Sequence, residues 1–142
     1  MVDLAGRLCK PDVDALAAAI PMPPEDALRA MLSRGGCAAV CIDGRPEALF
    51  GCNSYTSRPD RGFPWFAASS SAFKSEERIA GLIRVSQRFV ARWQERYAEL
   101  VTMSDQRHTV YAEWLALLGF TAMGQLAAAS GHLFNLYFKG AD

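Results

Sequence analysis

The feature that most constrains the fold is a long amphipathic segment over residues 74–100. Its apolar residues recur at the three- and four-residue spacing of an α-helix. They are Ile79, Leu82, Ile83, Phe89, Val90, Trp93, Tyr97 and Leu100. A helix with one apolar face has to bury that face against a second layer of the domain. We therefore expect a long surface helix, starting near Ser75, that packs on a sheet.

Short apolar runs before and after this helix predict the strands of that sheet. Residues 37–42 and 46–52 flank Asp43-Gly44, a dipeptide typical of a two-residue hairpin turn. Pairing across that turn would place Ala39 on the same face as Ala48. The other expected strands are 63–68, 100–103, 120–128 and 132–139, and the other expected helices are 12–20, 24–34 and 108–118. Because the sequence shows no repeat or linker, we expect one domain over residues 1–142.

Composition excludes several classes of function. The 15 Lys and Arg residues balance the 15 Asp and Glu residues, so the chain lacks the basic footprint of a general nucleic-acid binder. No apolar run approaches the ~20 residues that span a bilayer. The first residues include Asp3 and lack a basic stretch followed by an apolar one. We therefore expect no membrane span and no secretion by a signal peptide.

The cysteines and histidines are spaced unlike the ligands of a zinc site. The cysteines are Cys9, Cys37, Cys41 and Cys52, and the histidines are His108 and His132. No CxxC pair occurs, and both histidines lie far from the cysteines along the chain. We expect reduced thiols that pack as small hydrophobic groups, and no bound metal.

The order of the expected elements, together with residues 113–120, resembles the GNAT superfamily of N-acetyltransferases. In that family a helix ending in Leu-Gly-Phe, here Leu118-Gly119-Phe120, leads into the last two strands. The resemblance implies a single GNAT-like α/β (α+β) domain. Its fold would be a central, mostly antiparallel mixed sheet with helices on both faces.

A second resemblance is to GNAT-like proteins of short-tailed phages and prophages, a family that includes internal virion protein A. It rests on residue type and spacing at Asp43-Gly44, Ala48-Leu49-Phe50-Gly51, Pro64-Trp65, Trp93 to Tyr97, Trp114-Leu115 and Phe134 to Gly140. This resemblance implies a virion-associated protein that contacts other virion proteins or a host protein. Its location would then be the phage virion or the host cytoplasm.

The cofactor loop departs from the GNAT pattern. Active GNAT enzymes hold the pyrophosphate of acetyl-CoA with a glycine-containing loop before the long helix, since glycines let backbone N–H groups approach closely. Residues 67–74 occupy this place and contain no glycine. The resemblance assigns cofactor binding here to Ala68, Ser69, Ser70, Ser71 and Lys74. Because the glycines are missing, we expect no cofactor, with acetyl-CoA as the alternative.

The proton-transfer positions also depart from the family. The usual donor is a tyrosine four residues before the glycine of the Gly-Phe step, and this position is Leu115, which has no exchangeable proton. Tyr111, one helical turn earlier, is a candidate replacement, and His108 is a candidate base. The sequence thus predicts a phage or prophage virion-associated protein with a GNAT-like fold and a degenerate catalytic site. The alternative is an acetyl-CoA-dependent N-acetyltransferase.

Four arginines form one basic stripe along the long helix. Arg84, Arg88, Arg92 and Arg96 are four residues apart, a spacing that drifts little around a helix of 3.6 residues per turn. Two interpretations stay open: a solvated face opposite the apolar one, or a surface for an acidic partner.

Overall fold

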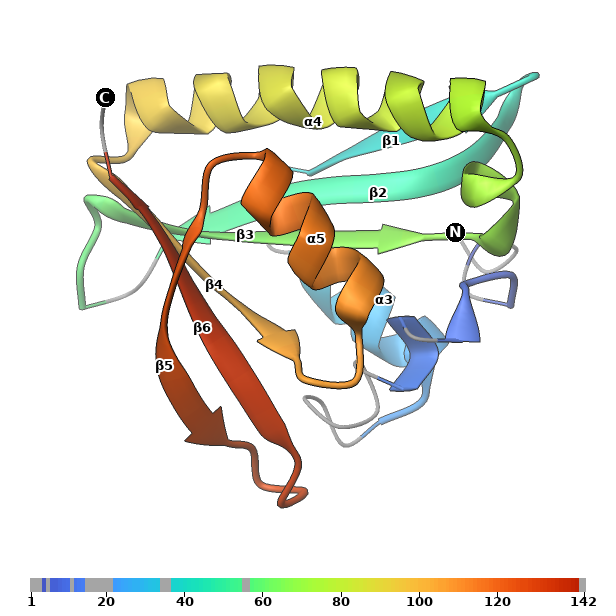
Figure 1. Ribbon diagram of the computed structural model, residues 1–142. Coiled ribbons are helices and arrows are strands. Elements are labelled where there is room, and N and C mark those ends of the chain that lie inside the picture. The colour runs from blue at the N-terminus through green and yellow to red at the C-terminus, as the bar shows by residue number, and fades with distance from the viewer. Residues whose placement is uncertain are drawn as a thin grey trace.

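The centre of the molecule is a six-stranded sheet with helices on both faces (Figure 1). The computed structural model describes residues 4, 6–10, 12–14, 22–33, 37–54 and 57–140. The strands are β1 (Cys37–Ile42), β2 (Arg45–Ser54), β3 (Arg61–Ala68), β4 (Glu99–Asp105), β5 (Thr121–Ala127) and β6 (Leu133–Gly140). The helices are α3 (Pro24–Ser33), α4 (Glu76–Arg96), α5 (Thr109–Leu117) and the 3-10 turn η1 (Ser70–Phe73). The strand order is β1-β2-β3-β4-β6-β5, and the predicted fold class is confirmed.

The first predicted helix, over residues 12–20, lies mostly outside the described residues. Residues 12–14 are helical, and Leu8 forms an isolated antiparallel bridge with Ser69. Within the described ranges, no helix is both long enough and apolar enough to cross a membrane.

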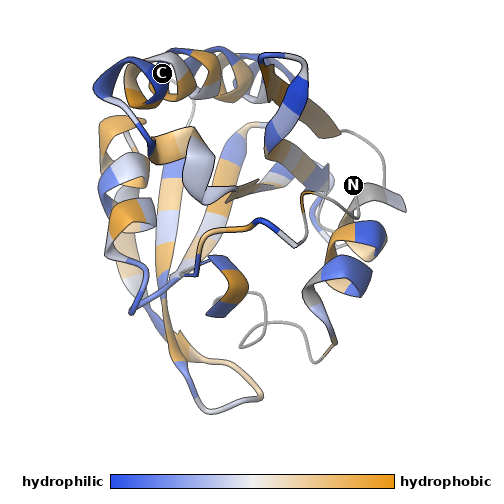
Figure 2. Cartoon of the chain, turned by 90° about the vertical axis from the view of Figure 1, so that its right-hand side faces the viewer, coloured by the Kyte–Doolittle hydropathy of each residue, from blue (hydrophilic) through white to orange (hydrophobic). Residues whose placement is uncertain are grey.

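The long helix α4 begins at the predicted cap. The Ser75 Oγ accepts the Arg78 N–H at 3.1 Å, which satisfies one of the unpaired donors of the first turn. Hydrophobic and hydrophilic bands alternate along α4 (Figure 2), and its buried side chains include Leu82 and Val90. The amphipathic pattern therefore predicted the helix and its buried face.

The end of α4 differs from the prediction of a helix up to Leu100. The helix ends at Arg96, and Tyr97 already has extended backbone angles. The Ala98 N–H then donates to the carbonyl of Asp60 at 2.8 Å, and Leu100 belongs to β4. Tyr97 and Leu100 are buried, so their apolar character reflected the core and not a continued helix.

The hairpin of β1 and β2 has a one-residue shift that the sequence did not predict. Ala48 pairs with Val40 instead of Ala39, because a bulge falls after Val40 and Cys41 pairs with Pro46. Glu47 is the extra residue, and one extra residue reverses which side chains share a face. Val40, not Ala39, therefore packs against the core beside Ala48.

Two apolar clusters lie on opposite faces of the sheet. The cluster under α4 and α5 includes Phe50, Leu82, Val90, Trp114 and Leu115, with Phe66, Phe89 and Trp93 packed against it. The cluster under α3 and the N-terminal segment consists of Leu4, Leu8, Leu28, Leu49, Trp65 and Ala67. Trp65 is only 4% exposed and belongs to the core on the α3 side.

The sheet parts between β3 and β4. These parallel strands pair only at Arg61 with Glu99 and at Gly62 with Leu100. Pro64 follows and has no N–H to offer a neighbouring strand. Its carbonyl instead accepts the Thr102 hydroxyl at 2.8 Å, so a side chain from β4 satisfies the edge where the ladder stops.

Gly51 is a position where the fold requires the absence of a side chain. A Cβ added there would lie 2.4 Å from the Trp65 ring. We expect Gly51→Ala to lower the free energy of unfolding by about 1–3 kcal/mol, measured by urea denaturation. Gly81→Ala is the matched control, because its Cβ would meet nothing nearer than 3.9 Å and alanine favours a helix by about 0.5–1 kcal/mol. Equal stability of the two variants would contradict this packing.

Candidate functional site

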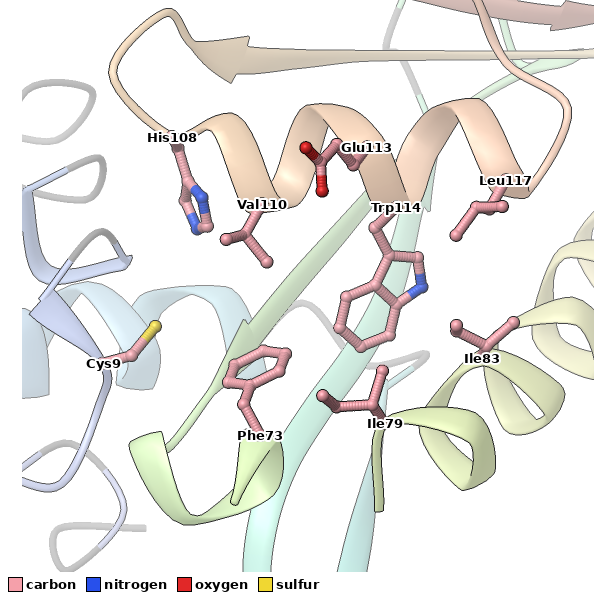
Figure 3. A pocket seen from close by; sticks show the side chains of 9 residues that line it. All are labelled: Cys9, Phe73, Ile79, Ile83, His108, Val110, Glu113, Trp114 and Leu117. Carbon is pink, nitrogen blue, oxygen red and sulfur yellow. The ribbon is translucent and has the colours of Figure 1, made fainter. Parts of the chain in front are cut away.

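A pocket of about 410 Å³ opens between α5 and the start of α4, on the face of the sheet that these two helices cover (Figure 3). It is lined by Cys9, Phe73, Ile79, Ile83, His108, Val110, Glu113, Trp114 and Leu117. Its volume falls in the range of small-molecule sites, about 300–1,000 Å³.

The pocket wall is almost entirely apolar and partly open to solvent. Val110 is 47% exposed and Leu117 is 62% exposed, although both are large hydrophobic side chains. Ile79, on the α4 side of the opening, is 37% exposed. Glu113 and His108 supply the ionisable groups other than the Cys9 thiol. The pocket therefore suits a ligand with an apolar body and few polar groups.

The space further in, between α5 and β3, is nearly filled by aromatic rings. The cavity there is only about 20 Å³. The Phe66 ring lies 6.2 Å from Trp114 and 5.6 Å from Tyr111, measured between centroids. Phe73 meets the Trp114 ring edge-on at 5.8 Å. A ligand that reaches the parting of the sheet has to move some of these rings.

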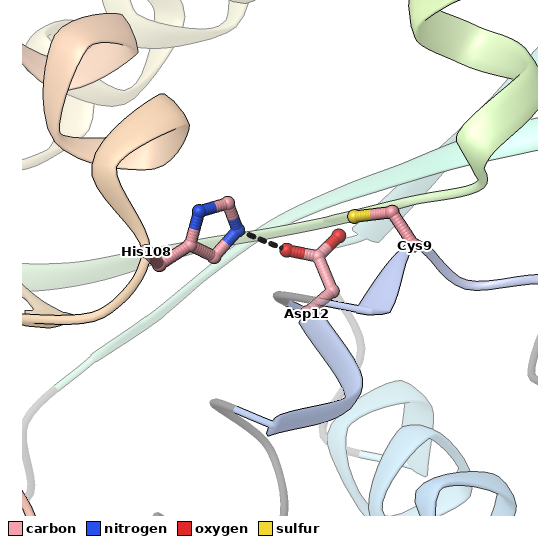
Figure 4. A group of neighbouring side chains, drawn as sticks. All are labelled: Cys9, Asp12 and His108. Carbon is pink, nitrogen blue, oxygen red and sulfur yellow. Dashed lines mark hydrogen bonds and ion pairs between the residues drawn. The ribbon is translucent and has the colours of Figure 1, made fainter.

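His108 is the N-cap of α5 and both its ring nitrogens have partners. The Nδ1 accepts the Tyr111 N–H at 3.1 Å, and the Nε2 lies 2.5 Å from Asp12 Oδ1 (Figure 4). A neutral imidazole that accepts at Nδ1 carries its proton on Nε2, so Nε2 donates to Asp12. His108 is only 5% exposed. As a base it would first have to release the Tyr111 N–H.

Asp12 joins the N-terminal segment to the end of β3 and to the start of α5. Its Oδ2 accepts the Ala68 N–H at 2.7 Å, at the end of β3, while Oδ1 meets His108 at the start of α5. The Cys9 N–H donates to the Ala68 carbonyl at 3.0 Å. The backbone of Ala68, a predicted cofactor contact, is thus already bonded within the chain.

Cys9, Asp12 and His108 form a compact group, with one ligand-type atom of each within 4.8 Å of the others (Figure 4). Burial, followed by the negative charge of Asp12, raises the pKa of the Cys9 thiol to about 12. Cys9 is therefore a neutral thiol at physiological pH and a poor nucleophile. The protonated Nε2 of His108 leaves no lone pair there for a metal ion.

The serine loop, residues 69–71 before α4, forms more hydrogen bonds within the chain than the sequence predicts. The Ser69 hydroxyl donates to buried Glu47 at 2.5 Å, and the Ser70 N–H contacts the carbonyl of Arg7 at 3.4 Å. Ser71 accepts the Arg78 guanidinium at 2.7 Å. Ser70 and Lys74 are exposed. The assignment of cofactor binding to this loop stays a prediction, and the structure leaves Ser70 and Lys74 as its surface groups.

Glu47 anchors the inward side of this loop. Burial raises its pKa, but hydrogen bonds from Ser69 and then Arg7 outweigh burial and hold the pKa below its usual value. The Arg7 guanidinium lies 2.7 Å from the Glu47 carboxylate. The ionised carboxylate thereby ties the N-terminal segment to the loop before α4.

Tyr111 projects from α5 toward the opening of the sheet. Burial raises the pKa of its phenol, while a hydrogen bond with Thr102 acts in the opposite direction. The phenol therefore stays protonated at physiological pH. Leu115, at the family's donor position, is completely buried in the core. The roles of Tyr111 and His108 in proton transfer stay predictions.

The arginine stripe lies on the solvent side of α4. Arg84, Arg88, Arg92 and Arg96 are all exposed. In the part of the chain that the structure describes, Arg84, Arg88 and Arg92 form no ion pair. The Arg96 guanidinium lies 5.4 Å from the centroid of the Tyr97 ring. An acidic partner for the stripe stays a prediction.

Sequence reasoning missed Asp12 and Arg78. Asp12 lies 96 positions before His108, and no local pattern relates the two residues. Arg78 did have a signal, because it stands three residues after Ser75, where a capping box has Glu or Gln. Its guanidinium returns to the Ser71 carbonyl at 2.9 Å.

We expect Cys41 to react readily with a thiol reagent in the native protein, and Cys9 and Cys52 to react only after unfolding. Cys41 is exposed, whereas burial raises the pKa of Cys9 and Cys52 to about 12 from 9.0. The folded chain keeps these two thiol protons where the unfolded chain loses them. The free energy of unfolding should therefore fall as pH rises from 9 towards 12.

The measurement is mass spectrometry of labelled peptides, combined with urea denaturation at about pH 8 and about pH 10.5. The double variant Cys9→Ala, Cys52→Ala should show a weaker loss of stability at the higher pH. Equal labelling of all the cysteines in the native state would contradict the buried thiols.

No protein-family model matches the sequence, and no curated protein is similar to it. Solved structures do share its fold. The ribosomal-protein-alanine N-acetyltransferase from Brucella melitensis is 9% identical, with a TM-score of 0.71 over 98% of this chain and 93% of that chain. An acetyltransferase from Bacillus subtilis in complex with CoA is 9% identical, with a TM-score of 0.65 over 89% of each chain.

A third match is the ribosomal-protein-S5-alanine acetyltransferase from Vibrio fischeri, 17% identical with a TM-score of 0.55. It covers 70% of this chain and 57% of that one, so this chain spans little more than half of its length. These matches give no support to the resemblance to phage virion proteins. At such low identity they establish the fold alone: the chain has the fold of the GNAT acetyltransferases.

Proposed function

We propose that this chain is an acetyl-CoA-dependent N-acetyltransferase. The observation that carries the proposal is the apolar pocket between α4 and α5, because its volume and its almost entirely apolar wall suit the thioester arm of an acyl donor. A fold can be kept while its chemistry changes, so the fold alone does not identify the reaction. The virion role expected from the sequence has no structural observation in its favour.

The donor would enter along the apolar wall. The thioester arm of acetyl-CoA would lie against Trp114 and Leu117, with its phosphates near the exposed Lys74. Glu76 and Glu77 in the first turn of α4 oppose the attraction of the helix N-terminus for phosphate. The positive charge for the phosphates therefore has to come from Lys74 and Arg78. We expect weaker cofactor binding than a glycine loop would give.

The transfer itself needs one attack and one proton donor. The nitrogen of a neutral amine attacks the thioester carbonyl, a C–N bond forms, the C–S bond breaks, and the sulfur leaves as a thiolate. Tyr111 lies outside the pocket lining, between α5 and β3, so it would protonate that thiolate only after the Phe66 and Trp114 rings move. The amide nitrogen would lose its extra proton to water, which would reprotonate the phenolate. Burial keeps the Tyr111 phenol protonated at neutral pH, as a proton donor has to be, although the same rise in pKa makes the phenol a weaker acid.

Isothermal titration calorimetry with acetyl-CoA, and with free CoA as comparison, tests cofactor binding. We expect a dissociation constant in the micromolar range, ~−8 kcal/mol at 1 μM. Val110→Trp should fill the pocket and raise the dissociation constant at least about tenfold, which is about 1.4 kcal/mol. Leu133→Trp is the matched control, since Leu133 is 45% exposed but lies on β6, outside the pocket lining. Absence of heat at millimolar acetyl-CoA would overturn the proposal.

Tyr111→Phe tests the proton donor separately from binding. We expect acetyl-CoA to bind the variant as it binds the wild type, because only a hydroxyl is removed from the site. The rate of CoA release with an acceptor amine should fall by about 10²–10⁴, the usual contribution of general acid catalysis. Steady-state assays that follow CoA release with a panel of amines measure this rate. An unchanged rate would exclude Tyr111 as the donor and leave the binding proposal standing.

A further inference from the structure

A second hollow, which we call the hairpin pocket, lies between the tip of the β1–β2 hairpin and the first turns of α4 (Figure 1). Its volume is about 450 Å³, within the range of about 300–1,000 Å³ that small-molecule sites have. It shares no lining residue with the pocket between α4 and α5. Its inner wall is apolar, because Val40, Leu82 and Val85 belong to the core cluster under α4 or pack against it. The hairpin pocket is therefore a separate candidate site.

Charged side chains of both signs line the hairpin pocket. The Arg78 guanidinium lies 3.7 Å from the Asp43 carboxylate, so these two charges compensate each other. The other two charged residues are Glu77 and Arg84, and both are exposed. Among the residues that the structure describes, neither of these two forms an ion pair. The pocket thus offers one unpaired carboxylate and one unpaired guanidinium to a ligand.

Gly81 separates these two unpaired charges. Glu77, Gly81 and Arg84 are spaced i, i+4 and i+7, so they share one face of α4. A Cβ added at Gly81 would meet nothing nearer than the Arg84 guanidinium, at 3.9 Å. An alanine would therefore fit there, and it would favour the helix more than glycine does. Packing within the chain does not explain this glycine, whereas the close approach of a ligand to the helix backbone does.

We propose that the hairpin pocket binds a linear zwitterion, a small molecule with an ammonium and a carboxylate at opposite ends of a short apolar chain. The Arg84 guanidinium would donate to the ligand's carboxylate, and the ligand's ammonium would donate to the Glu77 carboxylate. The apolar chain would lie over Gly81 against Val85. A ligand with a single charge would leave one of the two side chains unpaired, so both charges are needed for full affinity.

Titration of the isotopically labelled protein with ε-aminocaproate, followed by the NMR signals of its amides, tests both the site and the affinity. The amide signals of Gly81 and Ile42 should shift, and those of Val110 and Leu117 in the other pocket should not. Because the paired charges stay close to solvent, we expect a dissociation constant of about 0.1–1 mM. Hexanoate lacks the ammonium and hexylamine lacks the carboxylate, so each should bind at least about fivefold more weakly.

Two substitutions remove one charge each. Arg84→Gln should raise the dissociation constant of ε-aminocaproate at least about fivefold. Arg88→Gln is its matched control, because Arg88 is also exposed but lies outside the pocket lining, one turn further along α4. Glu77→Gln should weaken binding in the same way, and Glu76→Gln, at an exposed position outside the lining, is its control. Circular dichroism verifies that each variant is folded.

Gly81→Ala separates binding from folding, because it should stabilise the helix and yet weaken binding of ε-aminocaproate. An unchanged dissociation constant in this variant would contradict the position of the ligand over Gly81. Absence of shifts up to about 20 mM ligand, equal affinity for the three probes, or an equal loss in Arg84→Gln and Arg88→Gln would each overturn the proposal. The experiment contains no acetyl-CoA, so its outcome is independent of the proposed acetyltransferase activity.

Discussion

The early parting of β3 from β4 is the constraint on which the rest of the structure depends. Two residue pairs hold these parallel strands, and Pro64 then ends the ladder on the β3 side. Beyond that point the core between the strands cannot be closed by backbone hydrogen bonds. It is closed instead by rings from α5 and α4 that pack on Phe66. The apolar pocket lies on the outer side of that packing.

The N-terminal segment completes this arrangement through polar contacts. Asp12 bridges the end of β3 and the start of α5, and Glu47 holds Arg7 and Ser69 beside it. A buried carboxylate is tolerated only when its oxygens are satisfied, and both carboxylates here have several donors. The same contacts use groups that a cofactor would otherwise meet. Acetyl-CoA bound at this loop, as proposed, would therefore compete with the hydrogen bonds that stabilise the region.

Much of the fold could be predicted because its signals are local. Ser75, the apolar stripe of α4 and the Asp43-Gly44 turn each express the preference of a short segment. The errors arose where a distant contact decided the outcome. The spacing of Tyr97 and Leu100 fits a helix. The helix nevertheless ends at Arg96, because the Ala98 N–H donates to the Asp60 carbonyl instead of continuing the helical pattern. The bulge at Glu47 was not predictable, because its partners Arg7 and Ser69 are far away in sequence.

By itself, the sequence determined the positions of α3, α4 and α5, the strands and the apolar face of α4, since these follow from periodicity, capping and turn residues. It also marked His108, Tyr111 and the serine loop as the chemically distinctive positions. Only the tertiary structure decided which groups are free to act. In the folded chain both ring nitrogens of His108 have hydrogen-bond partners, and the Ser69 hydroxyl donates to buried Glu47. The pocket wall and the edge of β5 stay exposed. The physical reason is that a polar group's availability depends on partners brought close by folding, and their sequence separation carries no local signal.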